Sequence, residues 1–341
     1  MKLTWQRIDL HLHHPFRTAA AVRTHKQTIW VRFRHDGLEG WGEAVPADLY
    51  GQSLDSAERT LTAIANHLPS QPEPIEPLID LLLTEFDGQR ATVAAIDAAL
   101  HDWRARSNGL SVVNMLGLDP TAAPPTSVTL GIDSPQNLAV KMGELADFPI
   151  WKVKIGTESE DQTLALIRHH APAKTLRADA NMGWSADDAL DRLARAASHK
   201  LELVEQPCRC EDLETLRRLK LTRLCPIVAD ESCVRPADIP RIADCVDGIN
   251  IKLSKCGGIL EARRMIDLAR DRGLKVMLGC MIESSLGVSA AAALAPLADW
   301  IDLDGHLLLK EDPFTGLGGA RGRLTLGAAP GLGVRPRARE I

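Results

Sequence analysis

Residues 151–205 read WKVKIGTESEDQTLALIRHHAPAKTLRADANMGWSADDALDRLARAASHKLELVE. This stretch contains three short apolar runs, Trp151–Ile155, Leu176–Ala180 and Leu201–Glu205, with a helical pattern of apolar residues between successive runs. Apolar runs that alternate with helical segments are typical of parallel β-strands joined by helical crossovers. We therefore expect a βαβαβ unit here.

The same alternation extends in both directions along the chain. Five further runs occur at similar spacing: Ser127–Leu130, Ile227–Asp230, Gly248–Leu253, Val276–Met281 and Trp300–Leu303. Eight strands with helical crossovers predict a TIM-type barrel. The alternative is a doubly wound open sheet, which would need a glycine-rich dinucleotide turn after a strand, and the sequence contains none.

The residues before the barrel have a different pattern. Lys2–Leu12 and Thr28–Arg34 are typical of strands, and Ser53–His67, Ile75–Glu85 and Ala91–Arg106 have helical periodicity. Strands followed by helices predict a separate α+β unit. The proline-rich stretch Asp119–Pro125 is the expected linker to the barrel, and the last ~30 residues are expected to return to the N-terminal unit.

Composition indicates an ordinary globular protein. The chain has 341 residues and a net charge of -5, which gives no reason to expect nucleic acid or an anionic membrane as a partner. The first residues are too polar for a secretory signal, and the seven cysteines lack the spacing of a disulfide framework, so we expect reduced thiols in a cytoplasmic protein. Cys208 and Cys210 form a C-x-C pair without a second pair at zinc-site spacing.

Charged side chains stand at the ends of the apolar runs. Buried parallel strands should be apolar, yet these runs end in Lys152, Lys154, Asp179, Glu205, Asp230, Lys252, Asp302 and Asp304. The carboxyl ends of all barrel strands meet at one face, where active sites lie. Charges gathered there must pair or bind a metal, because an unpaired buried charge is too unfavourable.

Three of these charges, Asp179, Glu205 and Asp230, are carboxylates on consecutive strands. Carboxylates brought together repel one another unless a cation neutralises them. Because all the ligands are oxygens, the set favours Mg²⁺, with Mn²⁺ as an alternative, over Zn²⁺. Asn181 and Glu231 flank these acids and are expected to support them. A salt-bridge network with the barrel lysines is the structural alternative.

The lysines have the spacing of an acid–base pair. Lys152 and Lys154 are two residues apart and share the inward face of the second strand, as Asn250 and Lys252 do on the sixth. Repulsion from Lys152 and a nearby cation would lower the pKa of Lys154 toward neutrality, as a general base requires. Because the second and sixth strands lie on opposite sides of the ring, Lys154 and Lys252 would flank a substrate. Lys255 is out of phase and is expected to be a loop or helix-capping lysine.

Taken in order, five motifs resemble those of the muconate-lactonising subgroup of the enolase superfamily. They are Lys152-x-Lys154, Asp179-Ala180-Asn181, Glu205-Gln206-Pro207, Asp230-Glu231-Ser232 and Lys252-x-x-Lys255-x-Gly257-Gly258. The resemblance implies a modified (β/α)₇β barrel over residues 121–310 and a capping domain over 1–120, completed by about 311–341. It implies Asp179, Glu205 and Asp230 as Mg²⁺ ligands, Lys154 and Lys252 as the acid–base pair, and Lys152 as a contact to the substrate carboxylate.

Within that subgroup the pair Asp302-Leu303-Asp304 is similar to the signature of dipeptide epimerases, where it binds the substrate ammonium. The resemblance implies inversion of the α-carbon of the C-terminal residue through an enediolate. The partner would be a small dipeptide. Arg23, on a loop similar to one that closes over the substrate, would favour an acidic second residue such as that of L-Ala-D/L-Glu. Met281 and Glu283 would also line the pocket, and Glu283 would favour a cationic residue instead.

Other functions stay open at this point. The nearest alternatives are N-succinylamino-acid racemase, o-succinylbenzoate synthase and muconate cycloisomerase, whose substrates lack a free ammonium group. A barrel that binds small molecules without catalysis is the alternative from another class. The resemblance also implies a homo-oligomer, and recycling of cell-wall peptides would follow if Ala-Glu were the substrate.

Overall fold

The computed structural model describes residues 1–19, 21–69, 71–72, 74–326 and 329–337. It begins with a three-stranded antiparallel sheet in the order β1-β2-β3, formed by β1 (Lys2–Arg17), β2 (Val22–His35) and β3 (Leu38–Ala44). Asp36 and Gly37 both have positive φ and form the tight β2–β3 turn. Both long strands extend beyond their predicted ends. The pairing of β1 with β2 is irregular between His11 and Phe16.

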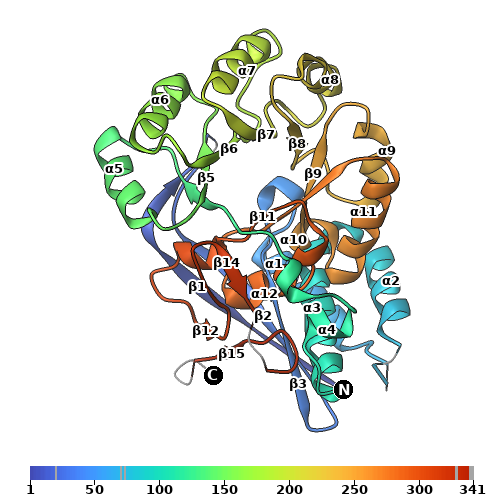
Figure 1. Cartoon of the computed structure of the whole chain (residues 1–341). Helices are drawn as coiled ribbons and strands as arrows, with labels where there is room; N and C mark the ends of the chain where they lie inside the picture. Colours follow the sequence, from blue (N-terminus) through green and yellow to red (C-terminus); the bar gives the residue numbers. More distant parts are fainter. Residues whose placement is uncertain (20, 70, 73, 327–328, 338–341) are drawn as a thin grey trace.

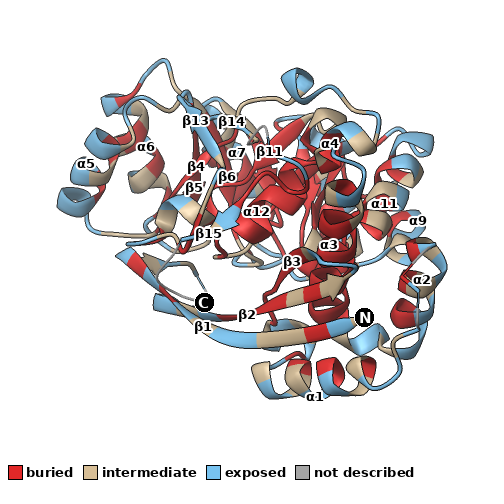
Figure 2. Ribbon diagram, turned by 90° about the horizontal axis from the view of Figure 1, so that it is seen from below, coloured by how far each residue is buried: buried red, intermediate tan, exposed pale blue. Residues whose placement is uncertain are grey.

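Three helices follow the sheet: α1 (Leu54–Ala65), α2 (Ile75–Glu85) and α3 (Arg90–Ser107). Ser53 caps α1 by accepting a hydrogen bond from the backbone N–H of Ser56, as its position before the helix predicts. Helix α3 is buried along most of its length between the sheet and the barrel (Figure 2). Gly40 and Gly42 allow β3 to lie directly against it, because a Cβ at either position would be 1.9 Å from a carbonyl oxygen of α3.

The barrel contains all eight predicted strands, in one parallel sheet whose spatial order follows the chain order (Figure 1). They are β4 (Val128–Leu130), β5 (Ile150–Lys154), β6 (Thr175–Asp179), β7 (Leu201–Glu205), β8 (Ile227–Ala229), β9 (Gly248–Lys252), β10 (Lys275–Gly279) and β11 (Trp300–Asp302). A doubly wound sheet reverses its strand order at a switch point, and this sheet does not. The barrel architecture is therefore confirmed.

Helices surround the strands on the outside, as Figure 1 shows. They are α5 (Pro135–Glu144), α6 (Glu160–His170), α7 (Ala189–Ser198), α8 (Leu213–Thr222), α9 (Ile239–Ile242), α10 (Leu253–Cys256), α11 (Ile259–Asp271) and α12 (Ser285–Ala292). The short α4 (Val112–Met115) joins the two parts of the chain. The 3₁₀ turns of the described residues are η1 (Asp48–Tyr50), η2 (Asp87–Gln89), η3 (Pro120–Ala122), η4 (Pro236–Asp238), η5 (Ala295–Leu297) and η6 (Gly305–Leu308). Helices follow seven of the eight strands, which is the (β/α)₇β arrangement.

Side chains help to join the first and last barrel strands, β4 and β11. The backbone N–H of Ser127 donates to Ile301 at 3.2 Å, and the Ser127 hydroxyl donates to Asp302 Oδ1 at 2.6 Å. The N–H of Thr129 donates to Asp304 Oδ2 at 2.7 Å. We call these contacts the barrel seam.

The C-terminal segment returns to the N-terminal sheet. It contains β12 (Phe314–Thr315), β13 (Gly318–Ala320), β14 (Arg323–Thr325) and β15 (Arg335–Pro336), which form two small ladders. The Phe314 ring meets Trp30 and Trp41 edge-on, at centroid distances of 4.9 and 5.9 Å. Asp102 of α3 accepts hydrogen bonds from the backbone of both Trp41 and Leu332. Among the described residues, no helix is long and apolar enough to cross a membrane.

Candidate active site

A cavity of about 260 Å³ lies at the carboxyl ends of the barrel strands, where the sequence predicts an active site. The barrel contributes most of its charged wall, and the β1–β2 hairpin and η1 contribute the opposite side. The lining residues include Lys152, Lys154, Asn181, Asp230, Glu231, Lys252, Met281, Asp302 and Asp304 from the barrel, with Phe16, Arg23, Lys26, Asp48 and Tyr50 from the N-terminal unit.

Strand β5 directs both of its lysines into the barrel. The Lys152 ammonium lies 3.0 Å from Asp179, 2.6 Å from Glu205 and 2.7 Å from Asp302, while that of Lys154 lies 2.6 Å from Asp179. Burial alone would lower the pKa of Lys152, but its three carboxylate neighbours outweigh burial and hold that pKa well above the usual value. Repulsion between the two lysines therefore does not set the pKa of Lys152, and this side chain stays charged.

The three predicted metal ligands lie side by side. Asp179 and Glu205 end β6 and β7 in paired register, and Asp230 follows β8 directly. Burial and the neighbouring Asp179 raise the pKa of Glu205 to about 7. Burial opposes ionisation of Asp179 too, but Lys152 and Lys154 lower its pKa to about 2. Without a further cation, therefore, these carboxyl groups are not all readily ionised together.

The sixth strand supplies the opposite wall. The Lys252 ammonium lies 2.8 Å from Asp230, and this carboxylate outweighs burial and keeps the pKa of Lys252 well above the usual value. Asn250, one step below on the same face, donates to Glu205 at 2.8 Å. Gly279 on the neighbouring strand leaves room for Asn250, because a Cβ there would lie 2.6 Å from its amide oxygen.

Lys255 differs from the sequence expectation. It is buried on α10, and its ammonium donates to Asp230 Oδ1 at 2.6 Å and to the carbonyls of Asp230, Cys233 and Asn250 at 2.5 to 3.0 Å. The prediction of a loop or capping lysine is therefore wrong, because the strand passes straight into a helix and turns Lys255 back under Asp230. Lys255 fixes that carboxylate instead of facing solvent.

The charges of the mouth fit a divalent cation. Four lysines and six carboxyl groups gather here, so full ionisation of all ten leaves an excess of two negative charges. They are Lys152, Lys154, Lys252 and Lys255, with Asp179, Glu205, Asp230, Glu231, Asp302 and Asp304. Burial and Asp230 raise the pKa of Glu231 to about 8. Glu231 Oε2 and Asn181 Oδ1 are buried without a hydrogen-bond partner among the described residues. Oxygen donors with unsatisfied lone pairs suit Mg²⁺.

The lysines currently occupy the space between the acids. The ligand oxygens of Asp179, Glu205 and Asp230 do not all lie within 4.8 Å of one another in the described chain. Asn181 is held beside them, with its backbone N–H donating to Asp179 at 2.9 Å and its side chain to Glu231 at 3.3 Å. Small rotations of the carboxylates and withdrawal of the ammonium groups would be needed to coordinate one ion.

Asp302 and Asp304 occupy different environments although both line the cavity. Asp302 is tied to Lys152 and Ser127, and these contacts outweigh burial and lower its pKa. Asp304 meets only neutral donors from Thr129, and burial together with Asp302 raises its pKa to about 6. Asp304 is thus the acid that lacks a cationic partner, which is the property needed to receive an ammonium group from a ligand.

The hairpin wall carries positive charge near Phe16. Arg23 and Lys26 both line the cavity, and Lys26 is held by a 2.7 Å hydrogen bond to the carbonyl of Pro46. Burial and the neighbouring Arg23 lower the pKa of Lys26. Sequence reasoning singled out Arg23 but missed Lys26, because no local pattern on an exposed hairpin shows which residues turn inward.

Met281 lines the cavity, as expected, but Glu283 does not contribute to its wall. Glu283 is buried behind it, with its carboxylate against Gly287 and the Met281 backbone. Burial and the neighbouring Glu43 raise its pKa to about 8. A neutral, enclosed Glu283 is poorly placed to attract a cationic substrate.

Both parts of the chain match family models. Residues 3–117 match the mandelate racemase/muconate lactonizing enzyme N-terminal domain, and residues 136–341 match the enolase C-terminal domain-like model.

Relatives with different substrates are similar over nearly the whole chain. The chain is 34% identical to the L-Ala-D/L-Glu epimerase of Bacteroides thetaiotaomicron, over 98% of this chain and 88% of that protein. It is 36% identical to a hydrophobic dipeptide epimerase of a Flavobacteria bacterium, over 93% of each. The dipeptide epimerase of Methylococcus capsulatus, solved with Mg and L-Arg-D-Lys, superposes with a TM-score of 0.91 at 32% identity and covers 98% of this chain and 99% of that one.

Proposed function

The chain belongs to the enolase superfamily, in the branch of mandelate racemase and muconate lactonizing enzyme, and from this membership we propose that it is a Mg²⁺-dependent dipeptide epimerase. The observation that carries the proposal is the arrangement of Lys154 and Lys252 on opposite walls of one cavity with Asp304 at its edge. N-succinylamino acids and muconate lack a free α-ammonium group, so they would leave Asp304 without its cation. We propose the division into residues 1–120 with 311–341 and residues 121–310 as the cap and the barrel.

The metal would be held by Asp179, Glu205 and Asp230, with Asn181 and Glu231 beside them. When bound, Mg²⁺ supplies positive charge that stabilises the enediolate form of the substrate carboxylate. Lys152, which stays charged, contacts that carboxylate. Neutralising Asp230 also weakens the interaction that holds the pKa of Lys252 high, so occupation of the site lets this lysine both give up and take up a proton.

The two remaining lysines carry the proton. Lys154 Nζ removes the α-proton of the C-terminal residue from one face, and Lys252 Nζ delivers a proton to the other face. The reverse direction exchanges these roles. Asp304 holds the substrate ammonium at the barrel seam, which fixes the dipeptide so that its α-carbon lies between the lysines.

The side chain of the second residue points toward the hairpin wall. Arg23 and Lys26 outnumber the single acid there, Asp48, so an acidic residue fits best. We propose L-Ala-D/L-Glu and similar dipeptides as the preferred substrates. The alternative of a cationic residue loses its support because Glu283 lies outside the cavity.

The test is α-proton exchange in D₂O with Mg²⁺ and a panel of acidic, hydrophobic and cationic dipeptides, read by mass spectrometry. The wild-type chain should exchange both epimers, acidic dipeptides fastest. Lys154→Ala and Lys252→Ala should each lose epimerisation by about 10³-fold or more. Each should still exchange the one epimer whose α-proton faces the remaining lysine.

Lys310→Ala is the matched control, because Lys310 is exposed and outside the cavity. Exchange of N-succinylamino acids without exchange of any dipeptide would disprove the epimerase function while leaving the family unchanged. No exchange of either class would identify a binding barrel.

A further inference from the structure

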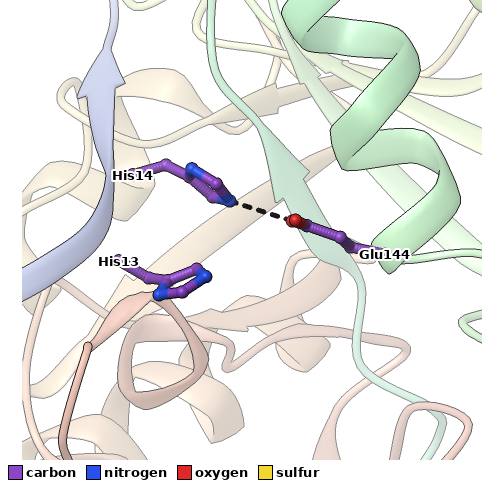
Figure 3. A group of neighbouring side chains, drawn as sticks. All are labelled: His13, His14 and Glu144. Atoms are coloured by element: carbon purple, nitrogen blue, oxygen red, sulfur yellow. Dashed lines mark hydrogen bonds and ion pairs between the residues drawn. The ribbon is translucent and has the colours of Figure 1, made fainter.

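Two histidines and a glutamate come together outside the cavity, where the β1–β2 hairpin meets the barrel (Figure 3). His14 Nε2 lies 2.9 Å from Oε2 of Glu144, the last residue of α5, and the rings of His13 and His14 are 4.5 Å apart at 70°. Neighbouring side chains of a regular strand point to opposite faces. The irregular pairing between His11 and Phe16 lets both rings face Glu144.

One ligand atom from each of these residues lies within 4.8 Å of the other two, and this is the one such trio of His, Cys, Asp or Glu in the described part of the chain. Around a tetrahedral ion with ligands at about 2.0–2.2 Å, neighbouring ligand atoms are about 3.3 Å apart. His13 and Glu144 are exposed and His14 is half-buried, so rotations of these side chains suffice to reach that spacing.

From this geometry we propose that His13, His14 and Glu144 form a second metal site, selective for Zn²⁺ or a similar transition-metal ion. Two imidazoles and one carboxylate suit such ions, whereas Mg²⁺ prefers oxygen ligands alone. Three protein ligands leave a fourth position for water. The nearby Lys141 does not compete for Glu144, because its ammonium is bound to Asp133 at 2.9 Å.

An ion at this site ties the hairpin to the barrel. Phe16 and Arg23 of the hairpin line the cavity, whereas Glu144 belongs to an outer barrel helix. The hairpin also reaches the barrel through the bond from the Ile132 N–H to the Arg17 carbonyl at 2.9 Å. A bound ion therefore restrains the wall that faces the second substrate residue.

The experiment is a Zn²⁺ titration of the full chain in saturating Mg²⁺, which occupies the carboxylates of the barrel. Wild type should bind one equivalent of Zn²⁺ more than His14→Ala and Glu144→Gln, with an affinity that falls about 100-fold or more when either ligand is lost. His67→Ala, which replaces an exposed histidine just after the end of α1, should bind like wild type. Co²⁺ in place of Zn²⁺ should give the visible absorption of a tetrahedral site only when all three ligands are present.

Amide hydrogen exchange tests whether the bound ion restrains the hairpin. Zn²⁺ should slow exchange in residues 12–26 of wild type and leave both variants unchanged. Lowering the pH to about 5.5 should release the ion, because the histidines must be neutral to bind it. Equal Zn²⁺ binding by wild type and His14→Ala would overturn the site, and unchanged exchange in the hairpin would overturn the restraint.

Discussion

At the scale of single residues, Asp302 and Asp304 belong to one sequence motif but have different partners. Asp302 neutralises Lys152, whereas Asp304 has only neutral donors. We expect Asp304→Asn to raise KM for dipeptides about 10- to 100-fold, because a charge-assisted hydrogen bond contributes about 1.5–3 kcal/mol. Asp302→Asn should instead lower kcat, because Lys152 loses a partner.

Steady-state kinetics on free and N-acetylated dipeptides measure this difference. The acetyl group removes the ammonium, so wild type and Asp304→Asn should become equally poor on the acetylated substrate. A KM effect of Asp304→Asn that persists on acetylated dipeptides would contradict ammonium binding.

The buried Glu283 predicts a dependence of stability on pH. Its pKa is about 8 in the folded chain, against 4.5 for an ordinary glutamate. Between these values the folded chain holds a proton that the unfolded chain has lost, so the free energy of unfolding falls as the pH rises. Glu283→Gln cannot ionise and should be more stable than wild type by on the order of 3 kcal/mol at pH 8.

Urea unfolding at pH 5.5 and pH 8, in the same Mg²⁺ concentration, measures the effect. The difference between the two chains should shrink to about 1.4 kcal/mol at pH 5.5, which is one unit above the ordinary pKa of 4.5. The epimerisation rate at neutral pH should be unchanged, since Glu283 lies behind the cavity wall. A large rise in KM for cationic dipeptides would show that it binds substrate after all.

Individual residues also show what a sequence can indicate. The inward charges of β5 and β9 follow from the two-residue period of a strand, so the interior position of Lys152 and Lys252 could be predicted. Lys255 could not be placed that way, because its orientation depends on a change from strand to helix within one residue of Lys252. Lys26 depends on how a distant hairpin folds over the barrel.

At the scale of elements, β3 lies directly against α3. A Cβ added to Gly42 would lie 1.9 Å from the Ala95 carbonyl oxygen, so the strand and the helix would have to separate. We expect Gly42→Ala to lower the free energy of unfolding by more than about 2 kcal/mol, as overpacking of a core does. Chemical denaturation of wild type and Gly42→Ala measures this loss of unfolding free energy.

Gly143→Ala provides the control for this substitution. Gly143 lies within α5 with open space around its Cα, so alanine there should stabilise the chain by about 0.5–1 kcal/mol. Equal effects at the two positions would mean that the contact with α3 is not the cause.

The elements themselves were largely predictable, but their ends were less so. All eight barrel strands appear where the sequence has apolar runs, six of which end in charge, because burial on both faces requires such runs. The β2 strand is longer than predicted because polar residues such as His25, Lys26 and Gln27 are paired with β1 in the backbone ladder. Backbone pairing of this kind leaves no hydrophobic signal.

At the scale of the whole molecule, Phe314 joins the C-terminal segment to the N-terminal sheet. We expect Phe314→Ala to lower the free energy of unfolding by about 3–5 kcal/mol, because a large buried ring is lost. The sheet should then unfold before the barrel. Four of the seven tryptophans lie in the N-terminal unit: Trp5, Trp30, Trp41 and Trp103. Tryptophan fluorescence should therefore begin to change at lower denaturant than far-ultraviolet circular dichroism.

Leu307→Ala is the control for this substitution, because it removes an exposed apolar side chain. It should change neither the fluorescence transition nor the circular dichroism transition. Coincident transitions in Phe314→Ala, with a loss below about 1 kcal/mol, would contradict the joining role. The sequence predicted the return of this segment from its prolines and glycines, but the partners of Phe314 are far away in the chain and follow only from the assembled fold.

The barrel seam has a consequence for how such a protein can change over generations. Asp304, which we propose to receive the ammonium, and its neighbour Asp302 also bind residues of β4 and the segment before it. A substitution that alters recognition of the first residue would therefore weaken the barrel seam at the same time. The inward residues of the hairpin, Arg23 and Lys26, are not part of the barrel seam, so substitutions there should change substrate preference with little loss of stability. Lineages that descend from this architecture should therefore diversify at the second residue of the dipeptide and retain the demand for a free amine at the first.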